Sequence, residues 1–194
     1  MRLKLICAKD KSALTKATSK KLVCAQGHSY PIVAGIPVLL RDEIEPTIKL
    51  AQASLSRARA LPGSIDKRCP DLYLESLGVS EAEKNLIVTL ADAPATTVDP
   101  VVSVILAATN GNLYKHLIGR LTTYPIPRLP LPQGEGKLLL DIGCGWGRWS
   151  IAAARNGYKV VGIDPSLGVL LAAQRVAKSM NIDITYLKSA SLCS

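Results

Sequence analysis

The stretch Lys137-Leu-Leu-Leu-Asp141-Ile-Gly143-Cys144-Gly145-Trp146-Gly147-Arg148 decides the fold of this chain. Its first part is a short apolar run that predicts a buried parallel strand, and the strand runs into an acid. Three alternating glycines follow, and they permit positive φ angles and a close approach of the backbone to a ligand. The pattern therefore predicts a strand that turns into a helix beside a nucleotide-like ligand.

The sequence after the turn continues the alternation of helix and strand. Residues 148–155 predict a helix, and residues 158–164 predict a second apolar strand that ends on an acid. A helix from Ser166 to about Met180 and a third strand at 182–187 come next. This order is typical of βαβ units, in which an acid at the second strand end can accept hydrogen bonds from both hydroxyls of a ribose.

Two kinds of ligand bind glycine-rich turns of this type, and two residues distinguish them. A dinucleotide fingerprint requires glycine or alanine three places after its second glycine, and Arg148 stands there. Asp141 ends the strand at the turn, where an acid suits a positively charged sulfonium and would repel a pyrophosphate. The spacing favours S-adenosylmethionine, and a nicotinamide or flavin dinucleotide stays open as the alternative.

The turn and the second acid resemble the first motif, D-x-G-x-G-x-G, and the second acidic position of class I S-adenosylmethionine-dependent methyltransferases. The resemblance implies an α/β fold with a partial Rossmann-like sheet, and methyl transfer from S-adenosylmethionine to a nucleophile. The cofactor-binding residues that it implies are Asp141, Gly143, Cys144, Gly145, Trp146, Gly147, Asp164 and Pro165. The catalytic residues are unknown, and the methyl acceptor, whether small molecule, RNA or protein, is unidentified.

The segment before the turn extends this resemblance. Residues 112–121, 124–127 and 134–137 are similar to a bacterial group of uncharacterised methyltransferases with a zinc-ribbon-like head. In related folds the helix at this place folds over the cofactor, which implies Tyr114 and Arg120 as further cofactor-binding residues. An ordinary amphipathic helix with a solvated polar face is the open alternative.

Two short groups of metal-binding side chains stand near the amino terminus. Cys7 and Asp10 form the first group, and Cys24 and His28 form the second. Tetrahedral zinc takes four sulfur, nitrogen or carboxylate ligands, and donors a few residues apart let one turn supply two of them. These four residues are the predicted metal ligands, with Asp10 where a fourth cysteine is expected. A small β-rich module with two buried thiols is the alternative.

Residues 30–40, Tyr-Pro-Ile-Val-Ala-Gly-Ile-Pro-Val-Leu-Leu, predict a strand, a turn at Ala34-Gly35 and a second strand. This segment resembles the zinc-ribbon family that includes the activator subunit of tRNA and protein methyltransferases. The resemblance implies zinc as a second cofactor and a methyltransferase-activating module as an alternative function. Some members of that family keep the fold without zinc.

The chain is basic, and the excess charge lies mostly near its start. It holds 24 Lys and Arg against 15 Asp and Glu, a net charge of +9, and residues 1–30 hold seven cations and one acid. Such a head predicts RNA contact through residues 1–30. Tyr30 is the single aromatic residue there, so a platform for stacking bases is missing. A solvated lysine face is the alternative.

Composition allows one or two domains, because 48% of the 194 residues are hydrophobic and 20% are charged. Three regions are predicted: a zinc-ribbon-like head at 1–43, a helical middle at 44–111, and the amino-terminal half of a methyltransferase domain at 112–194. In the middle, helices are expected at 44–60, in pieces over 71–90 with a capping box at Ser80 and Glu83, and from Asp99-Pro100 onward.

The cytoplasm is the predicted location. No apolar run is long enough to span a membrane, and the first residues lack the features of a signal peptide. Five cysteines form no disulfide framework, which is consistent with a reducing compartment. The sequence ends just after the third predicted strand, whereas a class I sheet has seven, so we expect a truncated or frame-shifted, inactive form with its first strand as an open edge.

Overall fold

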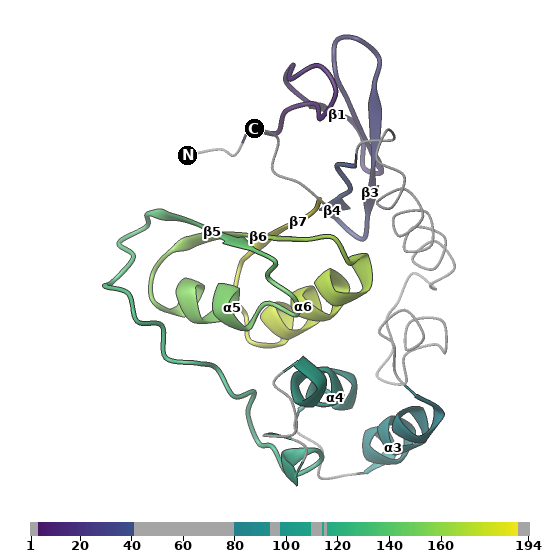
Figure 1. Ribbon diagram of the computed structural model, residues 1–194, viewed down its shortest axis with the longest axis vertical. Helices are drawn as coiled ribbons and strands as arrows, with labels where there is room; N and C mark the ends of the chain where they lie inside the picture. The colour runs from purple at the N-terminus through teal and green to yellow at the C-terminus, as the bar shows by residue number, and fades with distance from the viewer. Residues whose placement is uncertain (1–3, 41–79, 94–97, 110–113, 115, 190–194) are drawn as a thin grey trace.

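The computed structural model describes residues 4–40, 80–93, 98–109, 114 and 116–189. In Figure 1 these residues form an antiparallel sheet near the amino terminus, two helices labelled α3 and α4, and a parallel sheet with helices against one face. The parallel sheet carries the glycine turn, so its surroundings define the candidate site.

Strands and helices alternate in the parallel unit. Their bounds are β5 Leu138–Ile142, α5 Arg148–Arg155, β6 Lys159–Asp164, α6 Leu167–Ser179 and β7 Thr185–Lys188. The strands pair in the order β5-β6-β7, and both pairs are parallel. Because successive crossovers between parallel strands share one hand, α5 and α6 cover the same face of the sheet, as Figure 1 shows. The predicted alternation of strand and helix is confirmed.

The third strand begins three residues later than predicted, at Thr185 instead of residue 182. The residues between α6 and β7 close the end of the helix. Asn181 has a positive φ of 55°, and the backbone N–H of Ile182 donates to the carbonyl of Ala177 at 2.8 Å. A left-handed residue with such a bond is a common helix ending. The side chain of Ile182 therefore packs against the core next to α6 and takes no part in the sheet.

The prediction that the strand before the glycine turn is buried is wrong for one of its faces. Leu138, Leu140 and Ile142 are 52%, 46% and 63% exposed. Helices α5 and α6 cover one face of the sheet, as Figure 1 shows, and these alternate, exposed residues belong to the other face. Among the described strands β5 pairs with β6 alone.

The head, residues 4–40, is an antiparallel sheet in chain order. Its strands are β1 Thr15–Thr18, β2 Lys21–Val23, β3 Ser29–Val33 and β4 Ile36–Pro37. Ala34 and Gly35 join β3 to β4 with φ angles of 48° and 84°. Two left-handed residues in a row are the geometry of a tight hairpin, so the predicted turn at this place is confirmed.

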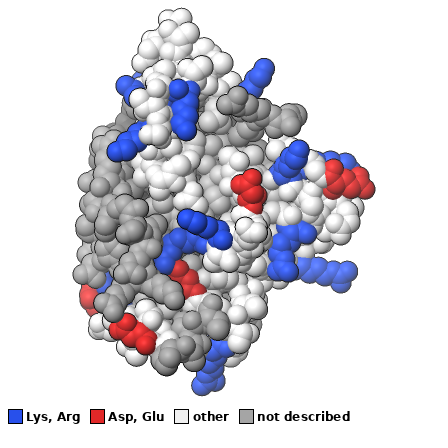
Figure 2. Space-filling model, turned by 180° about the vertical axis from the view of Figure 1, so that it is seen from behind, with Lys and Arg blue, Asp and Glu red and all other residues white. Residues whose placement is uncertain are grey.

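The surface of the head is basic. Figure 2 shows lysine side chains over it, and Asp10 is the one acid within residues 4–40. The exposed lysines of the head are Lys4, Lys9, Lys11, Lys16, Lys20 and Lys21. Because the carboxylate of Asp10 is directed into a cluster of thiol and imidazole groups, it leaves the outer surface with little negative charge.

The head is joined to the edge of the parallel sheet. Val38 forms a parallel bridge with Lys188 of β7, and the N–H of Leu39 donates to the carbonyl of Lys188 at 2.8 Å. The amide of Gln174 on α6 also donates to the carbonyl of Ala34 at 3.1 Å. The side chain of Lys188 is fully buried at this junction, and its Nζ has no hydrogen-bond partner among the described residues.

Two helices precede the parallel sheet. Helix α3, Glu81–Asp92, begins with the predicted capping box, in which Ser80 and Glu83 each bond the other's backbone. Helix α4, Pro100–Thr109, begins at the predicted proline, and Asp99 accepts the N–H of Val101 at 3.0 Å. The predicted helix at 44–60 and residues 71–79 of the predicted helical segment 71–90 lie outside the described residues.

The described part of the segment 112–121 is not the regular helix that the sequence predicts. Tyr114 and residues 116–121 contain a short 3₁₀ stretch followed by a turn. Gly119 lies in this turn with a φ of 73°, and a Cβ at this position would lie 2.6 Å from the side chain of Leu90 on α3. The turn therefore packs closely on α3.

Candidate cofactor turn and metal cluster

The three glycines of the motif adopt the positive φ angles that the sequence pattern predicts. Gly143, Gly145 and Gly147 have φ angles of 71°, 55° and 85°, all in the left-handed region. A Cβ at Gly143 would meet nothing within 4 Å, so a ligand can come close to the backbone there. Gly147 is different, because a Cβ would lie 2.7 Å from the hydroxyl of Tyr186 and 3.1 Å from Ala173.

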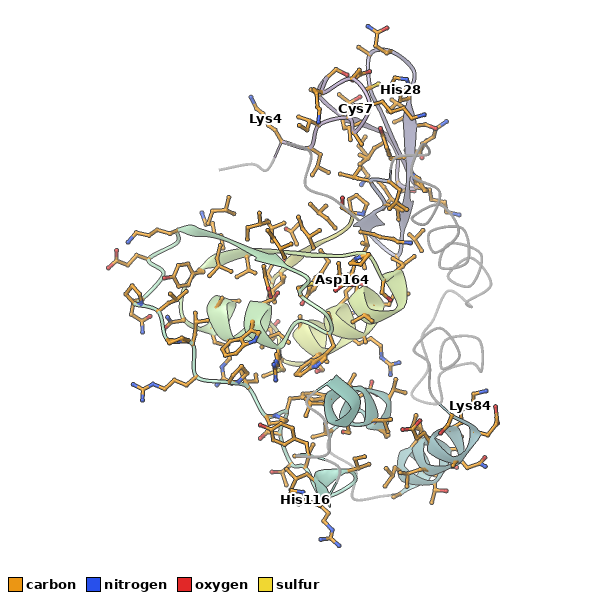
Figure 3. All side chains as sticks on the ribbon, in the orientation of Figure 1. Lys4, Cys7, His28, Lys84, His116 and Asp164 are labelled. Atoms are coloured by element: carbon orange, nitrogen blue, oxygen red, sulfur yellow. The ribbon has the colours of Figure 1, made fainter. Side chains whose placement is uncertain are left out.

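Two carboxylates hold this turn from the ends of neighbouring strands. Asp164 accepts the N–H of Gly145 with Oδ2 at 3.0 Å and the N–H of Ser166 with Oδ1 at 2.8 Å. Asp141 accepts the hydroxyl proton of Ser150 on α5 at 2.6 Å. Both carboxylates thus lie at the carboxyl edge of the sheet, where open α/β folds bind their ligands. Figure 3 shows Asp164 at this edge.

The backbone of the turn is also tied to the second strand. The N–H groups of Gly143 and Cys144 both donate to the carbonyl of Ile163, at 2.8 and 3.0 Å. The turn is therefore held in place before any ligand arrives. Such preorganisation lowers the conformational cost of binding.

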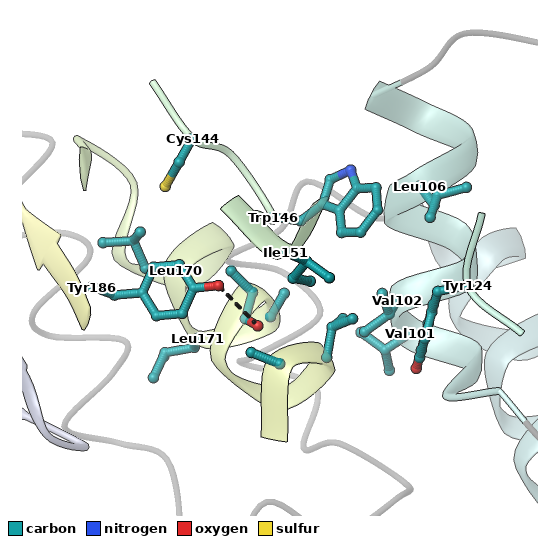
Figure 4. Close-up of a cluster of buried hydrophobic side chains, with 14 of the residues drawn as sticks. Val101, Val102, Leu106, Tyr124, Cys144, Trp146, Ile151, Leu170, Leu171 and Tyr186 are labelled. Carbon is teal, nitrogen blue, oxygen red and sulfur yellow. Dashed lines mark hydrogen bonds between the residues drawn. The ribbon is translucent and has the colours of Figure 1, made fainter. Parts of the chain in front are cut away.

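Two of the predicted cofactor residues are buried packing residues. The thiol of Cys144 is buried near Gly162, where a Cβ would lie 3.0 Å from its Sγ. Burial, together with the charges of Asp141 and Asp164, raises the pKa of this thiol well above its usual value. Figure 4 shows Trp146 beside Leu106 of α4, and it is only 2% exposed. Trp146 thus joins α4 to the turn and packs inside the core.

The remaining predicted cofactor residues lie in three places. Pro165 is exposed between Asp164 and the start of α6. Tyr114 packs partly buried against the shared core, and Arg120 is exposed. In Figure 3 His116, which lies between these two in sequence, is separated from Asp164 by α4. The described part of the structure shows no bond from Tyr114 or Arg120 to the turn.

The four predicted metal ligands lie together in the head. The donor atoms of Cys7, Asp10, Cys24 and His28 all lie within 4.8 Å of one another. Figure 3 shows Cys7 and His28 facing each other across the head. Nδ1 of His28 is 3.5 Å from each of the two sulfurs and 3.0 Å from Oδ2 of Asp10. The two thiols are buried, which separates this cluster from an ordinary surface group of polar residues.

The spacing of these atoms suits a tetrahedral metal. Zinc bonds of roughly 2.0–2.3 Å place neighbouring ligand atoms about 3.3–3.8 Å apart in a tetrahedron. The two contacts between Nδ1 of His28 and the sulfurs measure 3.5 Å and lie in this range, whereas the two contacts of Oδ2 of Asp10, with Nδ1 of His28 and Sγ of Cys24, are shorter at 3.0 and 3.1 Å. Two sulfurs, one nitrogen and one carboxylate oxygen are also donors that zinc accepts. The residues present therefore fit the ion.

Hydrogen bonds around the cluster favour the charged forms of its ligands. The hydroxyl and the N–H of Ser12 both bond Oδ1 of Asp10, and they hold the pKa of that carboxyl well below its usual range. Burial alone would raise the pKa of the Cys7 thiol. A hydrogen bond from the Tyr30 hydroxyl and bonds from the neighbouring backbone outweigh burial and lower that pKa.

Sequence reasoning missed three residues that support these sites. Ser12 and Tyr30 hold metal ligands, and Ser150 holds Asp141. A signal existed only for Ser12, because an acid followed two residues later by serine is typical of an Asx turn. Ser150 and Tyr30 reach their partners through the fold, and nothing in their spacing predicts the contact.

The carboxyl-terminal part of the chain is similar in sequence to known proteins. Residues 139–192 match the family described as methyltransferase domain. Ubiquinone biosynthesis O-methyltransferase of Alkalilimnicola ehrlichii is 40% identical over 52 residues, which are 27% of this chain and 21% of that protein. The chain thus spans about a fifth of the length of this relative. This match supports the predicted methyltransferase domain for residues 139–192.

A solved structure gives a weaker likeness. An O-methyltransferase family 2 protein from Planctomyces limnophilus, in complex with apigenin, covers 76% of this chain and 50% of its own length at 16% identity, with a TM-score of 0.33. A TM-score of this size does not establish a shared fold.

In the described residues, no helix is both long and apolar enough to cross a membrane.

Proposed function

We propose that this chain contributes the S-adenosylmethionine-binding turn of an enzyme that transfers a methyl group to an acceptor still to be identified. The observation that carries the proposal is the arrangement at the ends of β5 and β6. Three left-handed glycines form the turn there between two carboxylates, and the backbone is open to a ligand at Gly143. S-adenosylmethionine supplies a methyl group bonded to a positively charged sulfur, which a nucleophile can displace.

The residues of the turn have separate tasks in this proposal. Each oxygen of Asp164 already accepts one backbone N–H, and the lone pairs that remain can accept the two ribose hydroxyls. Gly143 leaves the space in which the ligand lies against the backbone. Asp141, fixed by Ser150, puts negative charge near the sulfonium. Positioning of this kind is the main contribution that a methyltransferase needs from its protein.

A titration of the wild-type chain with S-adenosylmethionine and, separately, with NAD tests the assignment. Calorimetry should show binding of S-adenosylmethionine and no binding of NAD. Binding of NAD alone would instead support the dinucleotide alternative, and binding of neither would remove the turn as a cofactor site in this chain.

The second part of the proposal concerns the head, whose division from the rest of the chain at residue 43 stays a prediction. Cys7, Asp10, Cys24 and His28 would hold one zinc ion. All four positions of a tetrahedral ion are then filled by protein, which is typical of a structural and not a catalytic site. The ion would supply binding energy that links the two knuckles of a small module with little core of its own.

Elemental analysis of protein prepared without chelators tests the metal. One zinc per wild-type chain is expected, and Cys24→Ser should lose it. Cys144→Ser, which removes another buried thiol far from the cluster, is the matched control and should keep the ion. Wild-type protein without stoichiometric metal would refute the assignment.

The basic surface of the head favours an acceptor or partner that is a polyanion, such as RNA. Lys16, Lys20 and Lys21 lie on or between β1 and β2, all exposed. Reversing these three charges should weaken RNA retention, and the loss should shrink as salt rises. Reversal of Lys137, Lys159 and Lys178, which lie outside the head, is the control. Equal losses in both triple variants would show general charge attraction and no site.

A further inference from the structure

The hydroxyl of Tyr30 lies against the metal cluster from inside the head. Tyr30 belongs to β3, is only 4% exposed, and packs with Cys7, Cys24 and Leu22 in the small core of the head. It comes two residues after His28 in the chain. A side chain in this position can connect the two halves of the cluster.

The hydrogen bonds of Tyr30 fix the direction of its proton. The backbone N–H of Ala8 donates to the hydroxyl oxygen at 3.0 Å. The hydroxyl has one proton of its own, and Sγ of Cys7 lies 3.2 Å away. The sulfur of Cys7 is the acceptor that the described structure offers to this proton, and we assign the hydroxyl as the donor of this bond. Cys7 is thereby an acceptor, and a thiolate is the form of cysteine that accepts best and binds metal.

The same bond joins the two halves of the metal site. The knuckle that begins at Cys7 is closed by its own backbone, because Cys7 donates to the carbonyl of Ser12 at 2.8 Å and Lys11 donates to the carbonyl of Cys7 at 3.0 Å. The other knuckle is closed by the N–H of Cys24, which donates to the carbonyl of His28 at 3.0 Å. Tyr30 extends from the strand after the second knuckle and bonds both the side chain of Cys7 and the N–H of Ala8.

The geometry points to Tyr30 as a positioning residue of the metal site, which holds the sulfur of Cys7 toward the other three ligands by donating a hydrogen bond to it. The inference rests on the metal site proposed above. Outer partners of this kind orient the ligands of a metal, and their removal weakens binding without removing a donor atom. Tyr30 itself does not coordinate the ion.

Tyr30→Phe tests this role, with Tyr124→Phe as a matched control. The hydroxyl of Tyr30 accepts the backbone N–H of Ala8 at 3.0 Å, and the hydroxyl of Tyr124 accepts the backbone N–H of Asp99 at 2.9 Å. Both tyrosines are buried. Only Tyr30 also bonds a sulfur. Cobalt(II) is the probe, because its thiolate charge-transfer band reports the sulfur directly and its affinity can be measured by competition with a chelator.

Tyr30→Phe should weaken cobalt binding by roughly tenfold or more and shift the charge-transfer band, because the sulfur loses its donor. Tyr124→Phe should bind and absorb like the wild type. If wild-type protein binds no cobalt or zinc, the metal site itself is refuted. If it binds and Tyr30→Phe matches it in affinity and in spectrum, the metal site stands and the role of Tyr30 is refuted.

A measurement on the wild type covers the case in which Tyr30→Phe does not fold. In the cadmium-loaded protein, proton NMR should show a slowly exchanging hydroxyl of Tyr30 that couples to the metal through the sulfur. The exposed hydroxyl of Tyr158 is the internal reference. A Tyr30 hydroxyl that exchanges as fast as this reference would contradict the inference.

Discussion

Asp164 accepts the backbone N–H of Gly145 at 3.0 Å, and this bond joins the end of the second strand to the middle of the glycine turn. The other oxygen of the same carboxylate accepts the N–H of Ser166, where α6 begins. One side chain therefore fixes the turn and the following helix relative to each other. In the proposed function the same side chain also receives the ribose, so structure and binding depend on a single charge.

Asp164→Asn should weaken S-adenosylmethionine binding by roughly tenfold to a hundredfold, because hydrogen bonds to a charged acceptor contribute about 1.5–3 kcal/mol. An amide has one acceptor oxygen, so it cannot accept both Gly145 and Ser166. Asp183→Asn makes the same chemical change at an exposed position before β7 and should bind like the wild type. Calorimetry measures both affinities. Equal affinities for the two variants would show that Asp164 does not bind the cofactor.

Gly147→Ala should destabilise the fold by about 2–4 kcal/mol, since a left-handed φ and a close contact both oppose the new methyl group. The contact is with Tyr186, whose hydroxyl would lie 2.7 Å from the Cβ. Tyr186→Phe should therefore recover part of the loss in the double variant. Gly35→Ala has the same φ of 84–85° but no close neighbour, and it should lose only the conformational part. Urea unfolding gives the free energies of unfolding of the wild type, the two single variants and the double variant, and of Gly35→Ala as the control. If the effects of Gly147→Ala and Tyr186→Phe simply added in the double variant, the contact between the two residues would be contradicted.

Asp10→Cys should tighten zinc binding by roughly tenfold, because a third thiolate suits zinc better than a carboxylate. Asp10→Asn keeps the shape of the side chain but loses the charge, and it should weaken binding. Competition with a chromophoric chelator measures both affinities. Wild-type affinity in both variants would mean that Asp10 is not a ligand.

Lys188→Met should stabilise the protein by on the order of 2 kcal/mol at pH 7, because it replaces an unpaired buried charge with an apolar chain of similar length. Burial lowers the pKa of Lys188 to about 8, against 10.5 for an ordinary lysine. Between these values the unfolded chain holds a proton that the folded chain has released. The wild type therefore gains stability as pH rises from 8 to 10, and the advantage of Lys188→Met should shrink.

Urea unfolding at pH 7 and pH 10 measures this effect. Lys178→Met, at an exposed position near the end of α6, makes the same substitution without burial and serves as the control. If the difference in free energy of unfolding from the wild type changed with pH equally for Lys188→Met and Lys178→Met, the assignment to Lys188 would be contradicted.

Local signals in the sequence predicted the parallel unit well. The glycine turn, the acids at the strand ends and the caps at Ser80 and Asp99 act over a few residues, so the chain alone specifies them. The exposure of β5 was not predicted, because an apolar run does not say which face of a strand has a covering layer. The contact of Trp146 with Leu106 was not predicted, since α4 is distant in sequence.

The metal cluster was predicted from spacing, whereas the side chains that form hydrogen bonds to its ligands were not predicted. Two pairs of donors a few residues apart are a short-range pattern. The contact of Tyr30 with Cys7 joins residues 23 positions apart, so no short-range pattern predicts it. In the described part of 112–121 the helical pattern gave a wrong prediction, and Gly119 packs there closely against Leu90 of α3.

The bridge between Val38 and Lys188 has a consequence for the order of folding. It joins a residue near the start of the chain to the last described strand, so the contact cannot form until nearly all of the described chain has left the ribosome. Contacts of such long sequence separation form slowly. Residues 4–40 are synthesised before β7, and Val38, which is 2% exposed, pairs with β7. The contact that joins the head to the parallel sheet is thus among the last to form.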